Sequence, residues 1–464
     1  MSELRTRKTG LSDALREMSA LLGDRLTTSM PVREAHGRDE SWHPVMAPDA
    51  VAFAQSTDEV AAIVRICSAY GLPVIPFGTG TSLEGHISAP HGGLSLDLSQ
   101  MNRILKVNAE DLDVHLEAGV TRKALNVHLR DVGLFFPIDP GADASLGGMA
   151  ATRASGTNAV RYGTMRENVL NITAVMADGS VVHTARRARK SSAGYDLTRL
   201  LVGSEGTLGI ITELTLRLYG IPEAISSGVV SFTKFENAID AVIETIQSGI
   251  PMARIEFLDE VQVAACNRYS KLTLPETPLL LVEFHGSEAS VAEQATRFGE
   301  ITSAHGGGAF QWATKAEDRT KLWEARHNAL YASLALKPGK QGLITDVCVP
   351  ISNLAEAIKG TKADLAKSAI VAPMVGHVGD GNFHLIMLID PDNAAEVAEA
   401  QSIHDRMVLR ALALDGTCTG EHGIGEGKMQ FLVAEHGSGV AVMRAIKKAL
   451  DPQNILNPGK MFTL

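Results

Sequence analysis

The stretch 376–384, Gly-His-Val-Gly-Asp-Gly-Asn-Phe-His, is the part of the chain that most constrains its fold. It lies between two apolar runs of β-strand character, 369–371 and 385–389. Asp380-Gly381 is a strong hairpin signal, because a two-residue type I′ turn requires φ > 0 at both central positions. The pattern therefore predicts two antiparallel strands that are joined at this dipeptide.

The register of this predicted hairpin has a chemical consequence. Counting outward from the turn places His377 opposite His384. Directly opposed residues point to the same face, with Cβ atoms roughly 4.5–5.5 Å apart. Two imidazoles at that separation can share one divalent cation. The alternative interpretation is two polar residues on a solvated strand face.

A second cluster, Glu421-His422, favours the metal interpretation. It adds a carboxylate oxygen, which is a hard ligand, and another imidazole. Neighbouring residues in a regular strand point to opposite faces. These two side chains can therefore serve one site only from an irregular loop, and the glycines at 420 and 423 are consistent with such a loop.

Length and composition indicate a globular enzyme with several domains. A chain of 464 residues exceeds one ordinary core, so two or three domains are expected. The net charge of −10 argues against binding of nucleic acid or of anionic membranes. Four scattered cysteines without a Cys-x-x-Cys pair favour a reducing compartment. We therefore expect a cytoplasmic protein without disulfides.

No targeting or membrane-spanning segment is evident in the sequence. Three basic residues lie within the first ten positions, but no apolar stretch follows them. No apolar run approaches the ~18–20 residues that a spanning helix needs. We therefore expect a soluble protein, which is compatible with peripheral contact to a membrane partner.

Changes in pattern divide the chain into four segments. Residues 1–43 contain a short amphipathic helix, and 44–222 alternate strands with helices around glycine-rich loops. Residues 223–415 combine buried strands with amphipathic helices, which predicts an antiparallel sheet with helices on one face. Residues 416–464 close the chain. The predicted class is α+β.

Three glycine-rich clusters interrupt the second segment, at 77–85, 139–158 and 203–211. In the first, glycines and hydroxyls let backbone N–H groups converge on an anion without obstruction by Cβ atoms. It is neither a P-loop nor a Gly-x-Gly-x-x-Gly fingerprint. In the second, small residues dominate, so this segment lies against a large ligand or threads a crowded interior. Ordinary turns remain the alternative for each loop taken alone.

The order and spacing of all three clusters resemble the FAD-binding domain of the vanillyl-alcohol oxidase/p-cresol methylhydroxylase superfamily. The matching stretches are 76–82, then 139–140 with 147–149, then 194–197 with 203–209. The resemblance implies two small α+β subdomains that grip FAD between them. It implies backbone contacts to the pyrophosphate from the first cluster.

The same resemblance implies a set of cofactor-binding residues. They are Pro76, Gly78, Thr79, Gly80, Thr81, Ser82, Pro140, Ser145, Gly148, Ala151, Ser155, Gly156, Glu205, Gly209, Ile210 and Asn457. His86 is the nearest candidate for covalent attachment of a flavin, but it lies past the tight part of the loop. We therefore expect FAD to be bound non-covalently.

Four motifs in the second half of the chain resemble the FAD-linked 2-hydroxy-acid dehydrogenases. They are 323–328, 345–350, 377–384 and 420–425. The similarity is greatest to cytochrome-type D-lactate dehydrogenases, with glycolate oxidase subunits and D-2-hydroxyglutarate dehydrogenases as relatives. It extends over the chain from about residue 40.

This resemblance implies a mechanism and its residues. A divalent metal, expected to be Zn with Mn, Fe or Co as alternatives, would be held by His377, His384 and Glu421. It would polarise the hydroxyl of a D-2-hydroxy acid. His422 would take the hydroxyl proton, Arg326 would bind the carboxylate, and a hydride would pass to flavin N5. The alternative for Arg326 is a surface ion pair with a nearby glutamate.

Two positions favour a small substrate over a dicarboxylate. D-2-hydroxyglutarate dehydrogenases have a lysine just before the segment that corresponds to 345–346, and an asparagine two residues after the second histidine. Ile344 and Ile386 stand at these places. We therefore expect D-lactate, with glycolate and D-2-hydroxyglutarate as alternatives. Electrons would pass to cytochrome c, a quinone or a flavoprotein, and a homodimer is compatible with the sequence.

Two other classes of function fit parts of the pattern. In a metal-dependent hydrolase, the histidines and the glutamate would activate water and the glycine clusters would be turns. A non-catalytic flavin-binding subunit of a larger oxidase is the second alternative. The retained histidines and glutamate weigh against that subunit.

Overall fold

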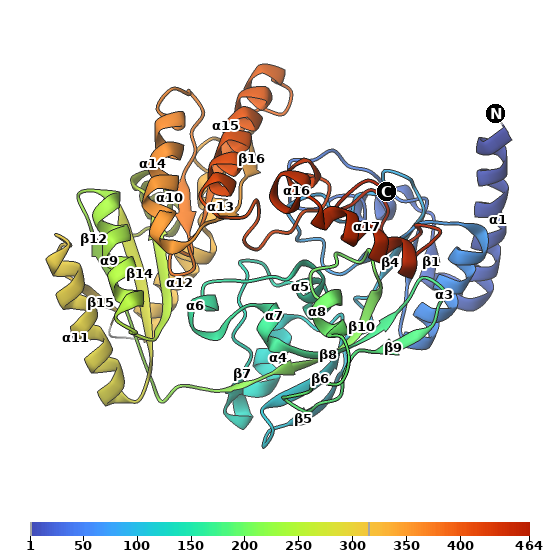
Figure 1. The fold of residues 1–464 in the computed structure, drawn as a ribbon, viewed down its shortest axis with the longest axis horizontal. Helices are drawn as coiled ribbons and strands as arrows, with labels where there is room; N and C mark the ends of the chain where they lie inside the picture. Colours follow the sequence, from blue (N-terminus) through green and yellow to red (C-terminus); the bar gives the residue numbers. More distant parts are fainter. Residues whose placement is uncertain (1, 314–315) are drawn as a thin grey trace.

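The computed structural model describes residues 2–313 and 316–464. Two bodies lie side by side, and the C-terminal helices α16 (Met429–His436) and α17 (Gly439–Leu450) lie toward the first of them (Figure 1). Phe431 of α16 belongs to the core of the second body, whereas Leu456, just after α17, is buried in the core of the first. The C-terminal segment therefore ties the two bodies together. None of the helices in the described residues is long and apolar enough to cross a membrane.

The first body contains the following elements: α1 (Ser2–Leu22), β1 (Leu26–Thr27), α2 (Met30–Ala35), β2 (Ala50–Phe53), α3 (Thr57–Tyr70), β3 (Val74–Phe77), β4 (Leu94–Asp97), β5 (Ile104–Asn108), β6 (Asp113–Glu117), α4 (Arg122–Leu129), β7 (Leu134–Phe135), α5 (Leu146–Thr152), α6 (Ala159–Tyr162), α7 (Met165–Asn168), β8 (Val169–Val175), β9 (Val181–His183), α8 (Leu197–Leu201), β10 (Ile210–Arg217) and β11 (Tyr219–Gly220). They form two small subdomains. One has the sheet order β1-β2-β4-β3, with β2 and β3 parallel to β4. The other is the antiparallel sheet β5-β6-β10-β8-β9.

Local sequence rules account well for the first sheet. Helix α3 begins after Ser56, whose side chain accepts a hydrogen bond from the Glu59 backbone, and ends at Gly71 with φ 61°. Its apolar side chains Ile63 and Val64 are fully buried in the core of this body. The loop with the first glycine cluster follows the carboxyl end of β3. The predicted α+β class with a two-subdomain first half is confirmed.

The second body contains these elements: β12 (Ala224–Ser231), α9 (Phe235–Gln247), β13 (Met252–Leu258), α10 (Glu260–Ser270), β14 (Leu279–Gly286), α11 (Glu288–Ala304), β15 (Gln311–Ala313), α12 (Ala316–His327), α13 (Ala329–Leu334), β16 (Gln341–Ile344), β17 (Val347–Cys348), α14 (Leu354–Leu365), β18 (Met374–Gly376), β19 (Asn382–Ile389) and α15 (Ala394–Ala413). Its antiparallel sheet has the order β15-β12-β14-β13-β18-β19-β16, and β17 also pairs with β19.

Helices cover both faces of this sheet, so the expectation of helices on one face was wrong. Strand β14 shows the reason, because its side chains alternate between two apolar clusters. Leu280 and Val282 pack with α9, α11, α14 and α15, whereas Leu279 and Leu281 pack with α10, α12 and α13. The sheet is buried on both sides, as a continuous apolar strand requires.

The predicted two-residue hairpin is also wrong in its register. Strands β18 and β19 pair Val375 with His384, and residues 377–381 form a longer loop between them. Gly381 has φ 80°, but Asp380 does not have a positive φ. The carbonyl of His377 accepts hydrogen bonds from the backbones of Asp380 (3.0 Å) and Asn382 (3.3 Å). These bonds close a loop that is longer than the predicted two-residue turn.

Candidate active site

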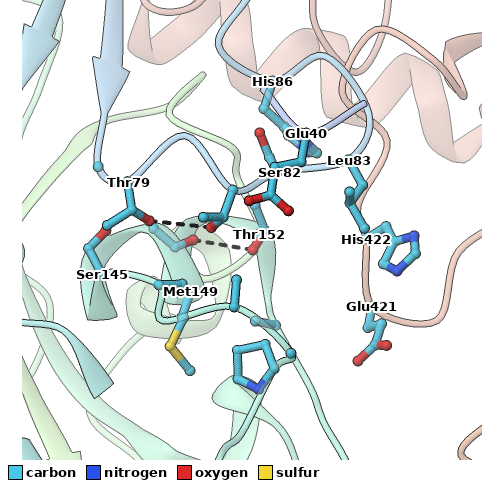
Figure 2. A pocket seen from close by; sticks show the side chains of 18 of the residues that line it. Glu40, Thr79, Ser82, Leu83, His86, Ser145, Met149, Thr152, Glu421 and His422 are labelled. Atoms are coloured by element: carbon cyan, nitrogen blue, oxygen red, sulfur yellow. Dashed lines mark hydrogen bonds between the residues drawn. The ribbon is translucent and has the colours of Figure 1, made fainter. Parts of the chain in front are cut away.

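A cavity lies between the two bodies and brings the three glycine clusters together with the motifs of the second half. In Figure 2, Thr79, Ser145 and Met149 line one part of it, while Glu421 and His422 lie at another. All but one of the predicted cofactor-binding residues line this cavity: Pro76, Gly78, Thr79, Gly80, Thr81, Ser82, Pro140, Ser145, Gly148, Ala151, Ser155, Gly156, Glu205, Gly209 and Asn457.

Ile210 is the exception. Its side chain is fully buried in the core of the first body and does not line the cavity. Side chains alternate along β10, so the neighbouring Ile211 faces the cavity instead. The side chain of Ile210 therefore does not line the cavity, and its contact with the cofactor stays a prediction.

The cavity suits a long polar ligand. At Gly78, a Cβ atom would lie 2.2 Å from Ser145 Oγ, so the missing side chain lets the first cluster approach the second without displacing this hydroxyl. Asn457 Oδ1 and His86 Nδ1 are buried beside the cavity and have no hydrogen-bond partner among the described residues. Backbone amides and unsatisfied polar atoms of this kind fit the phosphates and rings of FAD.

The three predicted metal ligands converge at the same cavity. His377 Nε2 lies 3.0 Å from Glu421 Oε1, and His384 Nε2 lies 3.3 Å from the same oxygen. The potential ligand atoms of the three residues lie within 4.8 Å of one another. The spacing could hold a single divalent cation, although the hairpin register that suggested it was wrong.

The imidazoles of His377 and His384 each make a further contact, through Nδ1, that fixes the orientation of the ring. His377 Nδ1 is 2.7 Å from Glu256 Oε1, and His384 Nδ1 is 3.1 Å from the carbonyl oxygen of Thr345. Each ring is therefore held through Nδ1, which leaves Nε2 for the shared carboxylate. Burial lowers the pKa of His377, but Glu256 and Glu421 outweigh this effect and raise it well above its ordinary value. This part of the site therefore attracts positive charge.

Glu256 was missed by sequence reasoning. It lies on β13, which was not predicted, and it is only 1% exposed. Its Oε2 accepts from Arg326 Nε (2.8 Å) and contacts Arg326 Nη2 (2.6 Å). Arg326 is itself buried at the cavity, so the alternative of a surface ion pair is wrong. The alternation of polar and apolar residues over 254–257 was the available, short signal.

An irregular loop carries Glu421 and His422 into the site, as predicted. Asp346 Oδ2 accepts hydrogen bonds from the backbones of both residues, each at 2.9 Å. The Glu205 carboxylate accepts from the backbones of Ile424 (2.7 Å) and Gly425 (2.8 Å). Two buried carboxylates, one from each body, therefore fix this loop. Asp346 was not predicted, and Glu205 has this second function beside its place at the cavity.

The surroundings of His422 favour a neutral imidazole. Its ring stacks on His384 with centroids 5.0 Å apart, and its Nδ1 lies 4.0 Å from Glu84 Oε1. Burial lowers the pKa of His422 to about 4, below the ordinary imidazole value. The ring is therefore unprotonated near neutral pH and available as a proton acceptor.

The remaining wall of this part of the cavity is apolar. Its side chains come from α13 and from strands of the second sheet: Leu330, Ile344, Val375 and Ile386. Ile344 and Ile386 therefore lie where the sequence comparison placed them, at the cavity. Tyr331 also lines the cavity and is 47% exposed, which places it at the entrance.

Comparison with known proteins gives independent information on both bodies. Residues 48–185 match the family described as FAD binding domain, and residues 221–461 match FAD linked oxidases, C-terminal domain. The fold is similar to that of p-cresol methylhydroxylase with substrate bound, with a TM-score of 0.82, 16% identity and coverage of 98% of this chain and 97% of that one. The match to a flavin-binding fold contradicts the hydrolase alternative, in which the glycine clusters were turns.

Two curated relatives cover most of the chain. The probable mitochondrial D-lactate dehydrogenase of Danio rerio is 56% identical over 93% of this chain and 88% of its own length. The mitochondrial D-lactate dehydrogenase [cytochrome] of Arabidopsis thaliana is 47% identical over 97% of this chain and 80% of its own length. Both are named as mitochondrial proteins, which contradicts the predicted cytoplasmic location.

These matches span both bodies and the cavity between them. The family matches place the glycine clusters up to residue 185 in an FAD-binding domain and the histidine and glutamate motifs in an oxidase domain. The chain therefore belongs to the FAD-linked oxidase family, in the group that contains the D-lactate dehydrogenases.

Proposed function

We propose that this protein oxidises D-lactate to the corresponding 2-oxo acid with FAD bound non-covalently in the cavity. One observation carries the proposal. The buried Arg326 and the half-buried His422 line the same cavity as the glycine clusters that match the FAD-binding domain. A carboxylate-binding group, a proton acceptor and a flavin site are the three elements that oxidation of a 2-hydroxy acid requires.

Arg326 and His422 have separate functions in the proposed reaction. Arg326 binds the substrate carboxylate, because its guanidinium offers a planar pair of donors. His422 removes the hydroxyl proton, and its low pKa keeps the ring neutral for that purpose. The glycine clusters would hold FAD, which would supply the acceptor for the hydride that leaves C2 of the substrate.

We further propose that His377, His384 and Glu421 hold a divalent metal, with Zn as the expected ion and Mn, Fe or Co as alternatives. The shared Glu421 oxygen and the two Nε2 atoms support this, because they form a compact set of nitrogen and oxygen donors. A metal held there would supply a Lewis acid for the substrate hydroxyl, whose proton would then be easier for His422 to remove.

The apolar wall supports a small substrate. Ile344 and Ile386 offer no partner for a second carboxylate, which would be buried without compensation. D-lactate places only a methyl group there. Glycolate, which lacks this methyl group, is the second candidate and D-2-hydroxyglutarate the third.

The electron acceptor is proposed from the relatives. The Arabidopsis relative is named a cytochrome-type enzyme, which supports cytochrome c as the acceptor. A quinone or another flavoprotein are the alternatives. A homodimer stays an expectation from the sequence.

The test is reduction of the bound flavin without oxygen. D-lactate, L-lactate, glycolate and D-2-hydroxyglutarate are added to the purified holoenzyme, and bleaching of the flavin absorbance is followed before and after treatment with a chelator. We expect rapid bleaching by D-lactate, slow bleaching by the others, and loss of the rate after chelation. Equal rates with D- and L-lactate, or no bleaching at all, would contradict the proposal.

A further inference from the structure

One buried carboxylate connects the two halves of the proposed substrate site. Glu256 lies on β13, between β14 and β18 in the sheet, and is only 1% exposed. Its neighbours Ile255 and Phe257 belong to the apolar core on the far side of the sheet. Because side chains alternate along a strand, Glu256 points to the face that carries the cavity.

Both oxygens of this carboxylate are occupied. Oε1 is 2.7 Å from His377 Nδ1, while Oε2 accepts from Arg326 Nε at 2.8 Å and lies 2.6 Å from Arg326 Nη2. The first contact turns Nε2 of His377 toward Glu421 at 3.0 Å. The second holds the Nε edge of the Arg326 guanidinium, which leaves Nη1 and the second N–H of Nη2 as donors at the cavity.

The two imidazoles differ in how they are held. His384 is oriented by a backbone carbonyl, that of Thr345, which no substitution removes. His377 depends on the side chain of Glu256. A carboxylate behind a metal-binding histidine fixes its tautomer and raises its basicity, and loss of such a group typically costs about 10–100-fold in metal affinity.

We propose that Glu256 is a positioning residue that sets the geometry of the metal ligand His377 and of the carboxylate-binding Arg326 together. This inference rests on the proposed function and deepens it. Glu256 does not touch the substrate. It links recognition of the substrate carboxylate to the site that polarises the substrate hydroxyl, so one substitution should disturb both.

A buried ion pair of purely structural importance is the competing explanation, and the chain offers a matched control for it. Glu283 is buried on the neighbouring strand β14 and contacts the same kinds of group, His285 Nε2 at 2.9 Å and Arg254 Nε at 3.6 Å. It does not line the cavity. Its partner Arg254 does not line the cavity either, so substitution of Glu283 reproduces the loss of a buried glutamate that contacts a histidine and an arginine without removing a contact of His377 or Arg326.

The experiment compares Glu256→Gln with Glu283→Gln in the FAD-loaded full-length protein. Affinity for Zn²⁺ is measured by competition with a chelator in the absence of substrate, and kcat and KM are measured with D-lactate. The amide of glutamine can accept from one partner but presents its NH₂ group to the other, so the bridge is lost. For Glu256→Gln we expect about 10–100-fold weaker Zn²⁺ binding together with a raised KM for D-lactate, and for Glu283→Gln neither change.

Each outcome decides a different point. If the wild-type protein binds Zn²⁺ and Glu256→Gln binds it equally tightly with an unchanged KM, the inference is overturned and the proposed function stands. If the wild-type protein binds none of Zn²⁺, Mn²⁺ and Co²⁺, the proposed metal site fails, and an unchanged KM in Glu256→Gln then overturns the remaining part of the inference. Should Glu256→Gln not retain FAD, Glu256→Asp replaces it, because a carboxylate withdrawn by one methylene cannot reach both partners.

Discussion

The site shows how neighbouring residues determine the chemistry of a single side chain. An isolated imidazole has a pKa near ~6.5, and residue type alone suggests that His422 titrates near that value. In the fold, burial lowers its pKa to about 4. Glu421, the next residue, has a pKa well below its ordinary value: burial opposes its ionisation, but His377 and His384 favour it. Near neutral pH, His422 is therefore a neutral imidazole and the adjacent Glu421 an ionised carboxylate.

Replacement of His422 by alanine tests its function as proton acceptor. The cavity residues that match the FAD-binding domain are unchanged, so we expect FAD to stay bound. Bleaching of the flavin by D-lactate should fall by at least about 10²-fold, in line with typical contributions of general bases. Anaerobic stopped-flow absorbance measures both properties. His404→Ala is the control, since His404 is buried on α15 and does not line the cavity. Full-rate bleaching in His422→Ala would remove this residue from the mechanism.

The apolar wall offers a second test at the scale of the residue. Changing Ile344 to lysine and Ile386 to asparagine provides partners for a second carboxylate at the cavity. We expect kcat/KM for D-2-hydroxyglutarate to rise by about 10-fold or more and that for D-lactate to fall, because buried polar groups without a partner are costly. The apolar double variant Ile344→Leu/Ile386→Val should keep the original preference. An unchanged ratio of the two kcat/KM values in the polar variant would show that these positions do not select the substrate.

At the scale of the element, local patterns predicted some individual helices and strands but not the arrangement of the site. Helix α3, with Ser56 before it and Gly71 after it, follows from capping and periodicity alone. Strand β13 was missed, because Arg254 and Glu256 interrupt its apolar pattern. The buried Glu256 carboxylate is paired with His377, which lies 121 residues further along the chain. No local pattern contains that information.

The loop 420–425 is the element whose exact path matters most, and Asp346 controls it. Its carboxylate accepts from the backbones of Glu421 and His422 and from Thr419 Oγ1, the last at 2.7 Å. Asp346→Asn removes the charge behind these bonds, and hydrogen bonds to charged groups contribute about 1.5–3 kcal/mol each. We expect a lower Tm and a lower kcat with FAD content retained.

Asp364→Asn provides the control for this loop prediction. Asp364 on α14 pairs with Arg406 and Arg410 on α15, and none of the three lines the cavity. Thermal unfolding and steady-state kinetics with D-lactate separate the two variants. A normal kcat in Asp346→Asn would mean that the loop keeps its path without the carboxylate.

At the scale of the whole molecule, the cavity exists only where the two bodies meet. The family resemblance predicted which residues line it, and the structure brings all but Ile210 together. The contacts that hold the bodies in place were not predictable, since they join residues far apart in sequence. Asp139 and Arg254 are an example: Arg254 Nη2 lies 3.2 Å from Asp139 Oδ2, and its guanidinium lies over the Trp323 ring at 4.5 Å.

The contact of Asp139 with Arg254, called the junction below, should also make the free energy of unfolding depend on pH. Burial favours the neutral carboxyl of Asp139, but Arg254 and then His327 reverse this and lower its pKa far below the ordinary value. A carboxylate with a lowered folded pKa stabilises the fold fully above its unfolded pKa near ~3.9. This contribution is lost as the pH falls through the folded value.

Arg254→Met tests the junction. It leaves the Asp139 charge buried without its main partner, so we expect a loss of about 3–5 kcal/mol at pH 7. The difference in free energy of unfolding between wild type and variant should shrink below about pH 4. There Asp139 takes up a proton in the unfolded chain, so its ion pair with Arg254 stabilises the wild-type fold less. Thermal unfolding of the holoenzyme between pH 3 and 8 measures both effects. Arg161→Met is the matched control, because the half-buried Arg161 side chain also reaches from the first body to the second, but there it donates to a neutral group, the carbonyl of Pro251, and lies over the Tyr162 ring. A pH-independent difference between Arg254→Met and wild type would show that the arginine acts by packing on Trp323 rather than through the charge of Asp139.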